Sequence, residues 1–121
     1  MSDKPFRFGP VAMGIAGADV VKGPVQAAAG TGVPAQDIYL LIRHIHIVNK
    51  TSSSATFSLW LGASGAGAAG TEVIGQGLTV RARWVYDWYG MMRMEAADYL
   101  VGISDTTTAL VIQGEGIMVC I

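Results

Sequence analysis

Alternation between apolar and polar residues is the clearest pattern in this chain, and it predicts β-strands. Over residues 38–49 β-branched and aromatic side chains dominate, and Ile45 and Ile47 alternate there with His44 and His46. We expect this long strand to bury its isoleucines in a core and to turn both imidazoles to the opposite face.

A second alternating segment, residues 55–61, follows a short polar turn. The shortness of this turn predicts that the two strands form one hairpin, with Ile47 opposite Phe57. In that register the two histidines lie opposite Ser58 and Trp60 on the other face of the hairpin.

The same alternation predicts further short strands separated by polar or glycine-containing turns. They cover residues 6–11, 71–74, 78–80, 81–89 with a break or bulge at Gly90, 91–94 and 98–103, and residues 108–113 and 117–121 form a terminal hairpin over Gly114–Gly116. Strands at intervals of about 8–12 residues are typical of a β-sandwich. The predicted fold class is therefore all-β: a single β-sandwich of about eight antiparallel strands, with a jelly roll as the favoured topology.

The N-terminal third of the chain has a different character. Residues 12–35 are rich in Gly and Ala, with Pro24 and Pro34, and show neither strand nor helix periodicity. They form either a long surface loop or an extended arm that lies on a neighbouring subunit. We therefore divide the chain into an N-terminal arm or long loop, residues 1–35, and a β-sandwich domain, residues 36–121.

Composition narrows the classes of function. Hydrophobic residues make up 51% of the 121 positions and charged residues 14%, which excludes a disordered chain. A net charge of -1, from 8 basic and 9 acidic residues, gives no electrostatic footprint for direct nucleic-acid binding. So much apolar surface in one small domain predicts burial against other copies, and hence a homo-oligomer.

Signals for other compartments are not found in the sequence. Residues 1–5 lack the layout of a secretory signal, no apolar run is long enough to cross a membrane, and Cys120 is the only cysteine. We expect synthesis in a reducing cytosol, no membrane contact and no intrachain disulfide.

His44 and His46 are the strongest candidates for chemistry. Two imidazoles on one face of a strand can chelate a transition metal, but a complete site needs a third ligand. The sequence supplies no third histidine and no neighbouring pair of carboxylates. We therefore expect both side chains to be structural or to face a subunit. Metal binding and an interface that responds to mildly acidic pH are the alternatives.

Other chemical motifs are weak. Residues 65–70 match GxGxxG, but two glycines follow where a dinucleotide site needs a helix, so we predict no cofactor. The acidic residues are scattered, and no Ser-His-Asp or Cys-His arrangement is evident. We therefore predict no catalytic residue, no resident metal and no enzyme activity.

The aromatic segment around Asp87 has three interpretations. Alternation turns Trp84, Tyr86 and Trp88 to one face and Asp87 to the other. Aromatic rings with nearby arginines form subunit interfaces, core packing or a carbohydrate-binding patch. We favour an interface, and the predicted contact residues are Phe6, Phe8, Val11, His44, His46, Trp60, Arg81, Arg83, Trp84 and Trp88.

Two neighbouring segments carry a resemblance to a known group of proteins. Residues 42–51 (IRHIHIVNKT) and 55–62 (ATFSLWLG) resemble a hairpin that recurs in small virion proteins of tailed bacteriophages, and the likeness extends over residues 38–90. It implies a β-sandwich or jelly roll, often trimeric, with an N-terminal arm that reaches neighbouring subunits. The implied partners are the major capsid protein or other virion proteins.

The resemblance implies a head decoration (cement) protein that stabilises the capsid lattice, located in the virion after assembly in the host cytoplasm. A tail or collar component is the first alternative. The others are a carbohydrate-binding module that uses the rings of residues 84–89, and a small enzyme with a cupin-like metal site at His44 and His46.

Overall fold

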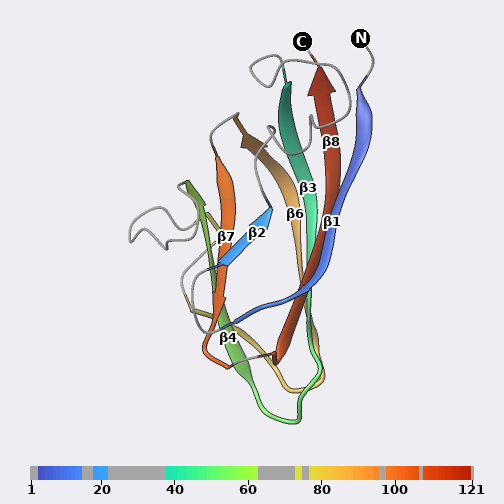
Figure 1. Cartoon of the computed structure of the whole chain (residues 1–121). Coiled ribbons are helices and arrows are strands. Elements are labelled where there is room, and N and C mark those ends of the chain that lie inside the picture. Colours follow the sequence, from blue (N-terminus) through green and yellow to red (C-terminus); the bar gives the residue numbers. More distant parts are fainter. Residues whose placement is uncertain are drawn as a thin grey trace.

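The computed structural model is built from β-strands (Figure 1). It describes residues 3–14, 18–21, 38–62, 73–74, 77–95, 98–106 and 108–120. The strands are β1 (Lys4–Ala12), β2 (Ala18–Val21), β3 (Ile38–Asn49), β4 (Ala55–Gly62), β5 (Leu78–Val80), β6 (Val85–Met94), β7 (Tyr99–Ser104) and β8 (Leu110–Cys120). No helix in this described part of the chain has the length and apolar character needed to cross a bilayer.

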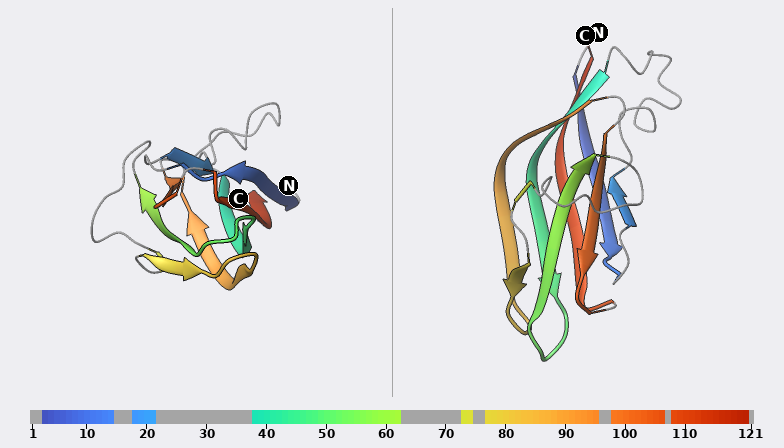
Figure 2. Two further views of the ribbon diagram at one scale, coloured as in Figure 1. Left: turned by 90° about the horizontal axis from the view of Figure 1, so that it is seen from below. Right: turned by 90° about the vertical axis from the view of Figure 1, so that its left-hand side faces the viewer.

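The strands form two four-stranded antiparallel sheets that face each other (Figure 2). The strand order is β1-β8-β3-β6 in one, here named the long sheet, and β2-β7-β4-β5 in the other, the short sheet. Successive strands pass from one sheet to the other, except for the β4–β5 pair. This double-sheet order is that of a jelly roll, so the predicted fold class is confirmed.

A bulge in β3 explains how one strand buries two sets of apolar residues. Ile42 and Ile45 are both completely buried although they are three positions apart. The register shifts between Ile42 and His44, where Arg43 is exposed and inserts one extra position relative to β8. Such an insertion changes which face the following residues point to. Beyond it, His44 and His46 turn away from the core.

The hairpin predicted for residues 38–61 is wrong. β3 pairs with β6 and β8, and β4 pairs with β5 and β7, so the two strands lie in different sheets. Ile47 is the Cα partner of Ile112, and Phe57 is the partner of Ser104. Both apolar side chains still reach one core, because that core lies between the two sheets.

The predicted terminal hairpin is also wrong, because β8 runs without a turn from Leu110 to Cys120. Its glycines serve close packing instead: a Cβ on Gly114 would meet the Phe8 ring, and one on Gly116 would meet the Leu41 carbonyl. Of the break or bulge predicted at Gly90, the structure has the bulge: β6 continues through Gly90 to Met94, and its register against β3 shifts between Tyr89 and Met92.

The N-terminal segment differs from the predicted arm where the structure describes it. Residues 4–12 pair with β8 at the edge of the long sheet, and residues 18–21 pair with β7 in the short sheet. Both stretches therefore belong to the sandwich, each as an edge strand of one sheet. The other parts of the predicted arm, residues 1–2, 15–17 and 22–35, and the GxGxxG match at 65–70 lie outside the described residues.

Candidate functional site

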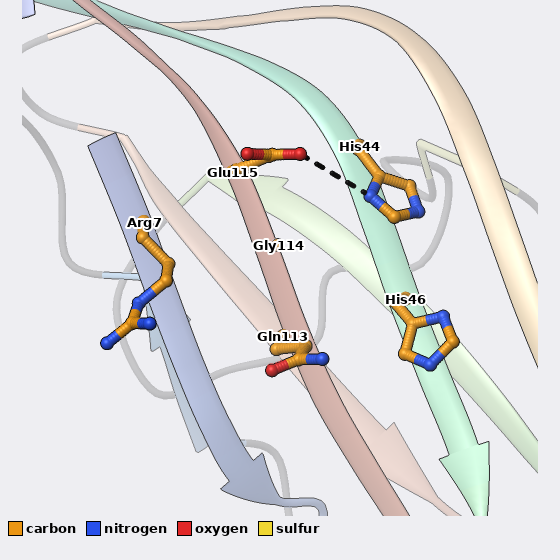
Figure 3. A pocket seen from close by; sticks show the side chains of 6 residues that line it. All are labelled: Arg7, His44, His46, Gln113, Gly114 and Glu115. Atoms are coloured by element: carbon orange, nitrogen blue, oxygen red, sulfur yellow. Dashed lines mark ion pairs between the residues drawn. The ribbon is translucent and has the colours of Figure 1, made fainter. Parts of the chain in front are cut away.

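The outer face of the long sheet, turned away from the core, carries two cross-strand rows of polar and aromatic side chains. The first row runs through Tyr89 on β6, His44 on β3, Glu115 on β8 and Arg7 on β1. The second row, one alternation further along, contains Asp87, His46 and Gln113. Strand pairing alone therefore brings together residues that are far apart in the sequence (Figure 3).

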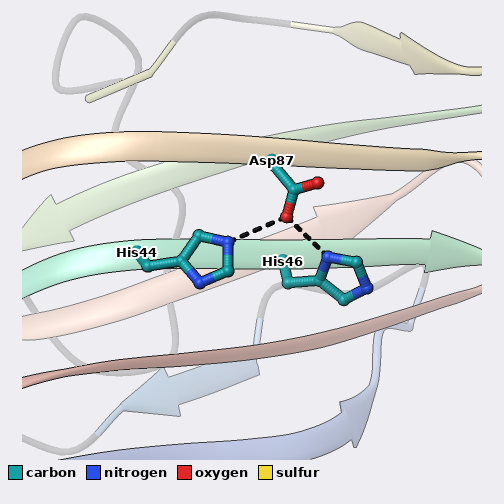
Figure 4. Close-up of side chains that lie close together, drawn as sticks. All are labelled: His44, His46 and Asp87. Carbon is teal, nitrogen blue, oxygen red and sulfur yellow. Dashed lines mark hydrogen bonds and ion pairs between the residues drawn. The ribbon is translucent and has the colours of Figure 1, made fainter.

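His44, His46 and Asp87 form the centre of this face (Figure 4). Asp87 Oδ1 accepts hydrogen bonds from His44 Nε2 at 2.8 Å and from His46 Nδ1 at 2.6 Å. The three side chains keep 25%, 26% and 30% of their surface exposed, respectively. The cluster is thus preformed and open to solvent.

The two imidazoles set the ionisation of the carboxylate. The hydrogen bond from His46, followed by that from His44, holds the pKa of Asp87 below its usual range, while partial burial acts in the opposite direction. An ionised carboxylate only accepts hydrogen bonds, so the facing nitrogens carry the protons: Nε2 in His44 and Nδ1 in His46.

Two neighbours fix the ring of His44. Tyr89 stacks on it with the ring centroids 4.5 Å apart and the planes 3° from parallel. Glu115 Oε1 lies 3.9 Å from the other ring nitrogen, Nδ1. A shallow hollow of roughly 360 Å³ opens beside the imidazoles and is lined by Arg7, His44, His46, Gln113, Gly114 and Glu115.

Large apolar side chains are exposed on β6, which is an edge strand of the long sheet, and at Trp84 in the turn just before it. The exposed fractions are 58% for Trp84, 41% for Val85, 72% for Tyr89 and 67% for Met91. These four residues are named the β6 edge patch. Within the described ranges β6 pairs with β3 alone, so its other side offers backbone groups to a further strand.

The predicted contact residues divide into surface and interior positions. Phe8 is a buried core residue whose ring fills the space beside Gly114. Because it is buried within the chain itself, it is no longer a candidate for contact with another subunit. Phe6 and Trp88 are partly buried against the core. The buried indole N–H of Trp60 has no hydrogen-bond partner among the described residues.

The other predicted contacts lie at the surface. Val11 is 41% exposed on β1. Arg81 places its guanidinium 5.3 Å from the centroid of the Trp84 ring, in the turn that precedes β6. Arg83, in the same turn, is exposed and has a left-handed backbone with φ 54°. These positions stay predicted contacts.

The aromatic segment does not present its rings on one face. Tyr86 and Trp88 pack against the core, whereas Tyr89 is exposed with the outward-facing Asp87, and Trp84 is exposed in the turn. Of the four aromatic rings in residues 84–89, only those of Trp84 and Tyr89 are therefore exposed and could contact a carbohydrate.

Sequence reasoning missed Asp87 as the partner of the two histidines. Asp87 stands opposite His46 across β3 and β6, a pairing hidden by the expected hairpin of β3 with β4. The sequence did indicate that Asp87 is a polar residue on the outward face of an amphipathic strand. Only the pairing of β3 with β6 turns that signal into a three-residue cluster.

No protein-family model and no curated protein sequence matches the chain. Its fold matches solved structures. A chain of Desmodium yellow mottle tymovirus superposes with a TM-score of 0.54 at 13% sequence identity, covering 97% of this chain and 78% of that one. The tobacco streak virus coat protein, described as a dimer, superposes with a TM-score of 0.52 at 9% identity, covering 98% and 84%. The chain therefore has the fold of a viral coat protein.

Proposed function

We propose that this chain is a structural subunit of a virion, which acts by binding its own copies and other virion proteins. The observation that carries the proposal is the superposition on the tobacco streak virus coat protein, which covers 98% of this chain and 84% of that protein. The likeness thus involves the complete jelly roll and not a shared hairpin. This role requires binding surfaces and no catalytic residue.

The β6 edge patch supplies a surface of the kind that such a subunit needs. Trp84, Tyr89 and Met91 each expose more than half of their area next to a strand edge that is open within the described part of the chain. Exposed apolar edges lead to association with other chains unless charge or a cover prevents it. In an assembly, association at this edge buries the patch and stabilises the contact.

Within this role we propose the decoration of a tailed-bacteriophage head, with the major capsid protein as the partner and a trimer as the oligomer. The resemblance of residues 38–90 to small phage virion proteins supports this assignment. The chain would then be located in the virion, after assembly in the host cytoplasm. Immunogold electron microscopy of virions that contain this chain tests this assignment. Label on the head supports decoration, whereas label on the tail or collar contradicts it and supports a tail or collar component instead.

The self-association itself is tested by sedimentation velocity and light scattering over a range of protein concentrations. Met91→Lys places a charge in the β6 edge patch, and the matched control Thr79→Lys places one at an exposed position of β5, the edge of the short sheet. We expect the wild type and Thr79→Lys to form one defined oligomer and Met91→Lys to dissociate. A wild type that stays monomeric at high concentration and binds no virion would contradict the proposed function.

A further inference from the structure

Three metal-ligand side chains converge on the outer face of the long sheet. His44, His46 and Asp87 each offer one donor atom, and these donor atoms lie within 4.8 Å of one another. From this geometry we propose that they bind a divalent transition-metal ion of the Zn²⁺ type. The proposal concerns the cluster alone and does not depend on the role of the chain in a virion.

The donor set suits such an ion. Two imidazole nitrogens and one carboxylate oxygen are ligands that Zn²⁺, Ni²⁺ and Co²⁺ accept, whereas Mg²⁺ and Ca²⁺ prefer oxygen ligands. Three protein ligands leave one position of a tetrahedral ion unfilled. Because the three side chains remain 25–30% exposed, water can reach that position.

Two of the three distances between the donor atoms require only a small adjustment. Tetrahedral Zn²⁺ with bonds of about 2.0–2.1 Å holds neighbouring ligand atoms about 3.3 Å apart. The present separations are 2.8 Å between His44 Nε2 and Asp87 Oδ1 and 2.6 Å between His46 Nδ1 and Asp87 Oδ1. Each of these two must open by about 0.5–0.7 Å. The two histidine nitrogens lie within 4.8 Å of each other, and they must also come to about 3.3 Å, so both imidazoles have to rotate when the ion binds.

The proton that the His44 ring must give up at Nε2 has a defined destination. Each facing nitrogen now donates to Asp87 and must lose its proton before it can ligate an ion. In a neutral imidazole the proton moves to the other ring nitrogen, and for His44 that is Nδ1. Glu115 Oε1 lies 3.9 Å from this atom, beyond hydrogen-bond distance, and its exposed side chain must move about 0.9 Å closer to accept the new N–H. A carboxylate on the far nitrogen of a metal-bound histidine orients the ring and strengthens it as a ligand.

The surroundings hold the cluster in place and are compatible with a cation. His44 is stacked on Tyr89, and the paired strands β3 and β6 fix His46 opposite Asp87. Asp87 and Glu115 bring two negative charges. The nearest cation that lines the hollow is Arg7 on β1, whose guanidinium lies beyond β8 from the imidazoles in Figure 3. Two strand spacings, roughly 9–10 Å, separate β1 from β3.

The test uses the full chain without a histidine tag and isothermal titration with ZnCl₂. We expect one Zn²⁺ per chain, and at least a tenfold weaker affinity in His44→Ala, His46→Ala and Asp87→Asn. Asp3→Asn, which removes an exposed carboxylate outside the cluster, and Cys120→Ser, which removes the only thiol, are the controls and should bind as the wild type does.

A readout on the unmodified protein keeps the test independent of folding defects in the variants. In long-range ¹H–¹⁵N spectra the ring signals of both histidines should shift when Zn²⁺ is added, and Co²⁺ should give the visible absorption of a tetrahedral site. The proposal is overturned if Zn²⁺ does not bind, if the histidine signals do not move, or if Cys120→Ser abolishes binding.

Discussion

The ring of Phe8 occupies the space into which a side chain on Gly114 would project. The two residues are Cα partners across β1 and β8, and a Cβ at Gly114 would also meet the backbone carbonyl of His44 on β3. Gly114 therefore allows the edge strand β1 to close over the core while β8 keeps its pairing with β3.

Gly114→Ala should destabilise the fold by about 1–3 kcal/mol, because overfilling a packed interior forces neighbouring atoms to move. The measurement is urea denaturation followed by intrinsic fluorescence. Gln113→Ala, at the adjacent exposed position, serves as the control and should change the free energy of unfolding by less than about 0.5 kcal/mol. Equal free energies of unfolding for Gly114→Ala and the wild type would show that the packing of the Phe8 ring does not require a glycine at position 114.

A strand such as β3 was predictable because, beyond its bulge, buried positions alternate with less buried ones. In β3 the alternation of Ile45 and Ile47 with His44 and His46 correctly separated core from surface. The number of such segments and their spacing then indicated a sandwich of jelly-roll type. These features depend on local periodicity, which a single sequence contains in full.

Strand pairing was not predictable in the same way, because period-2 alternation does not identify the neighbour. A short turn between β3 and β4 suggested a hairpin, yet the chain crosses there to the other sheet. Glycines were ambiguous for a similar reason: Gly114 and Gly116 can mark a turn or a close approach of two strands, and here they mark the latter. The contact of Asp87 with the histidines depended on the pairing of β3 with β6 and was missed with it.

Asn49 joins the end of β3 to two other segments. Asn49 is 1% exposed, and its side-chain nitrogen Nδ2 donates to the backbone carbonyls of Ser53 at 2.8 Å and Val80 at 3.0 Å. Its side-chain oxygen Oδ1 accepts hydrogen bonds from the backbone N–H and the hydroxyl of Thr51.

Asn49→Ala should therefore lower the free energy of unfolding by about 2–3 kcal/mol, because it leaves buried polar groups without partners. Chemical denaturation measures this loss. Asn49→Asp keeps the oxygen that accepts from Thr51 but removes both amide donors, so it separates the two halves of the network. A loss below about 0.5 kcal/mol for Asn49→Ala would mean that water replaces these bonds.

Trp84 and Trp88 are close in sequence and should respond differently to mutation. Trp88 packs against the core, whereas Trp84 is 58% exposed in the turn before β6. Trp88→Ala should cost about 2–4 kcal/mol of stability in thermal or urea unfolding, since a partly buried aromatic side chain is lost. Trp84→Ala should leave monomer stability within about 1 kcal/mol but weaken self-association in sedimentation velocity. The opposite pattern would place Trp84 in the core and remove it from the β6 edge patch.

Asp105 links the turn after β7 to β4 through a hydrogen bond from the Thr56 backbone N–H, at 2.9 Å. This bond is the main cause that lowers the pKa of Asp105 below its ordinary value of 3.8. A carboxyl group whose pKa is lower in the folded state stabilises the fold above its unfolded pKa, and this stability is lost as the pH falls through the folded pKa. Asp105→Asn, which lacks the charge, should be less stable than the wild type at pH 7 by at most about 1 kcal/mol, because the group is exposed.

The difference should shrink when urea denaturation is repeated at progressively lower pH, and it should disappear once the pH is below the lowered pKa of the wild-type carboxyl. Asp105→Ala separates charge from hydrogen bonding: it removes the acceptor as well and should stay less stable than the wild type at both pH values. A stability difference between the wild type and Asp105→Asn that is the same at pH 7 and at the lowest pH would show that the charge of Asp105 does not stabilise the turn.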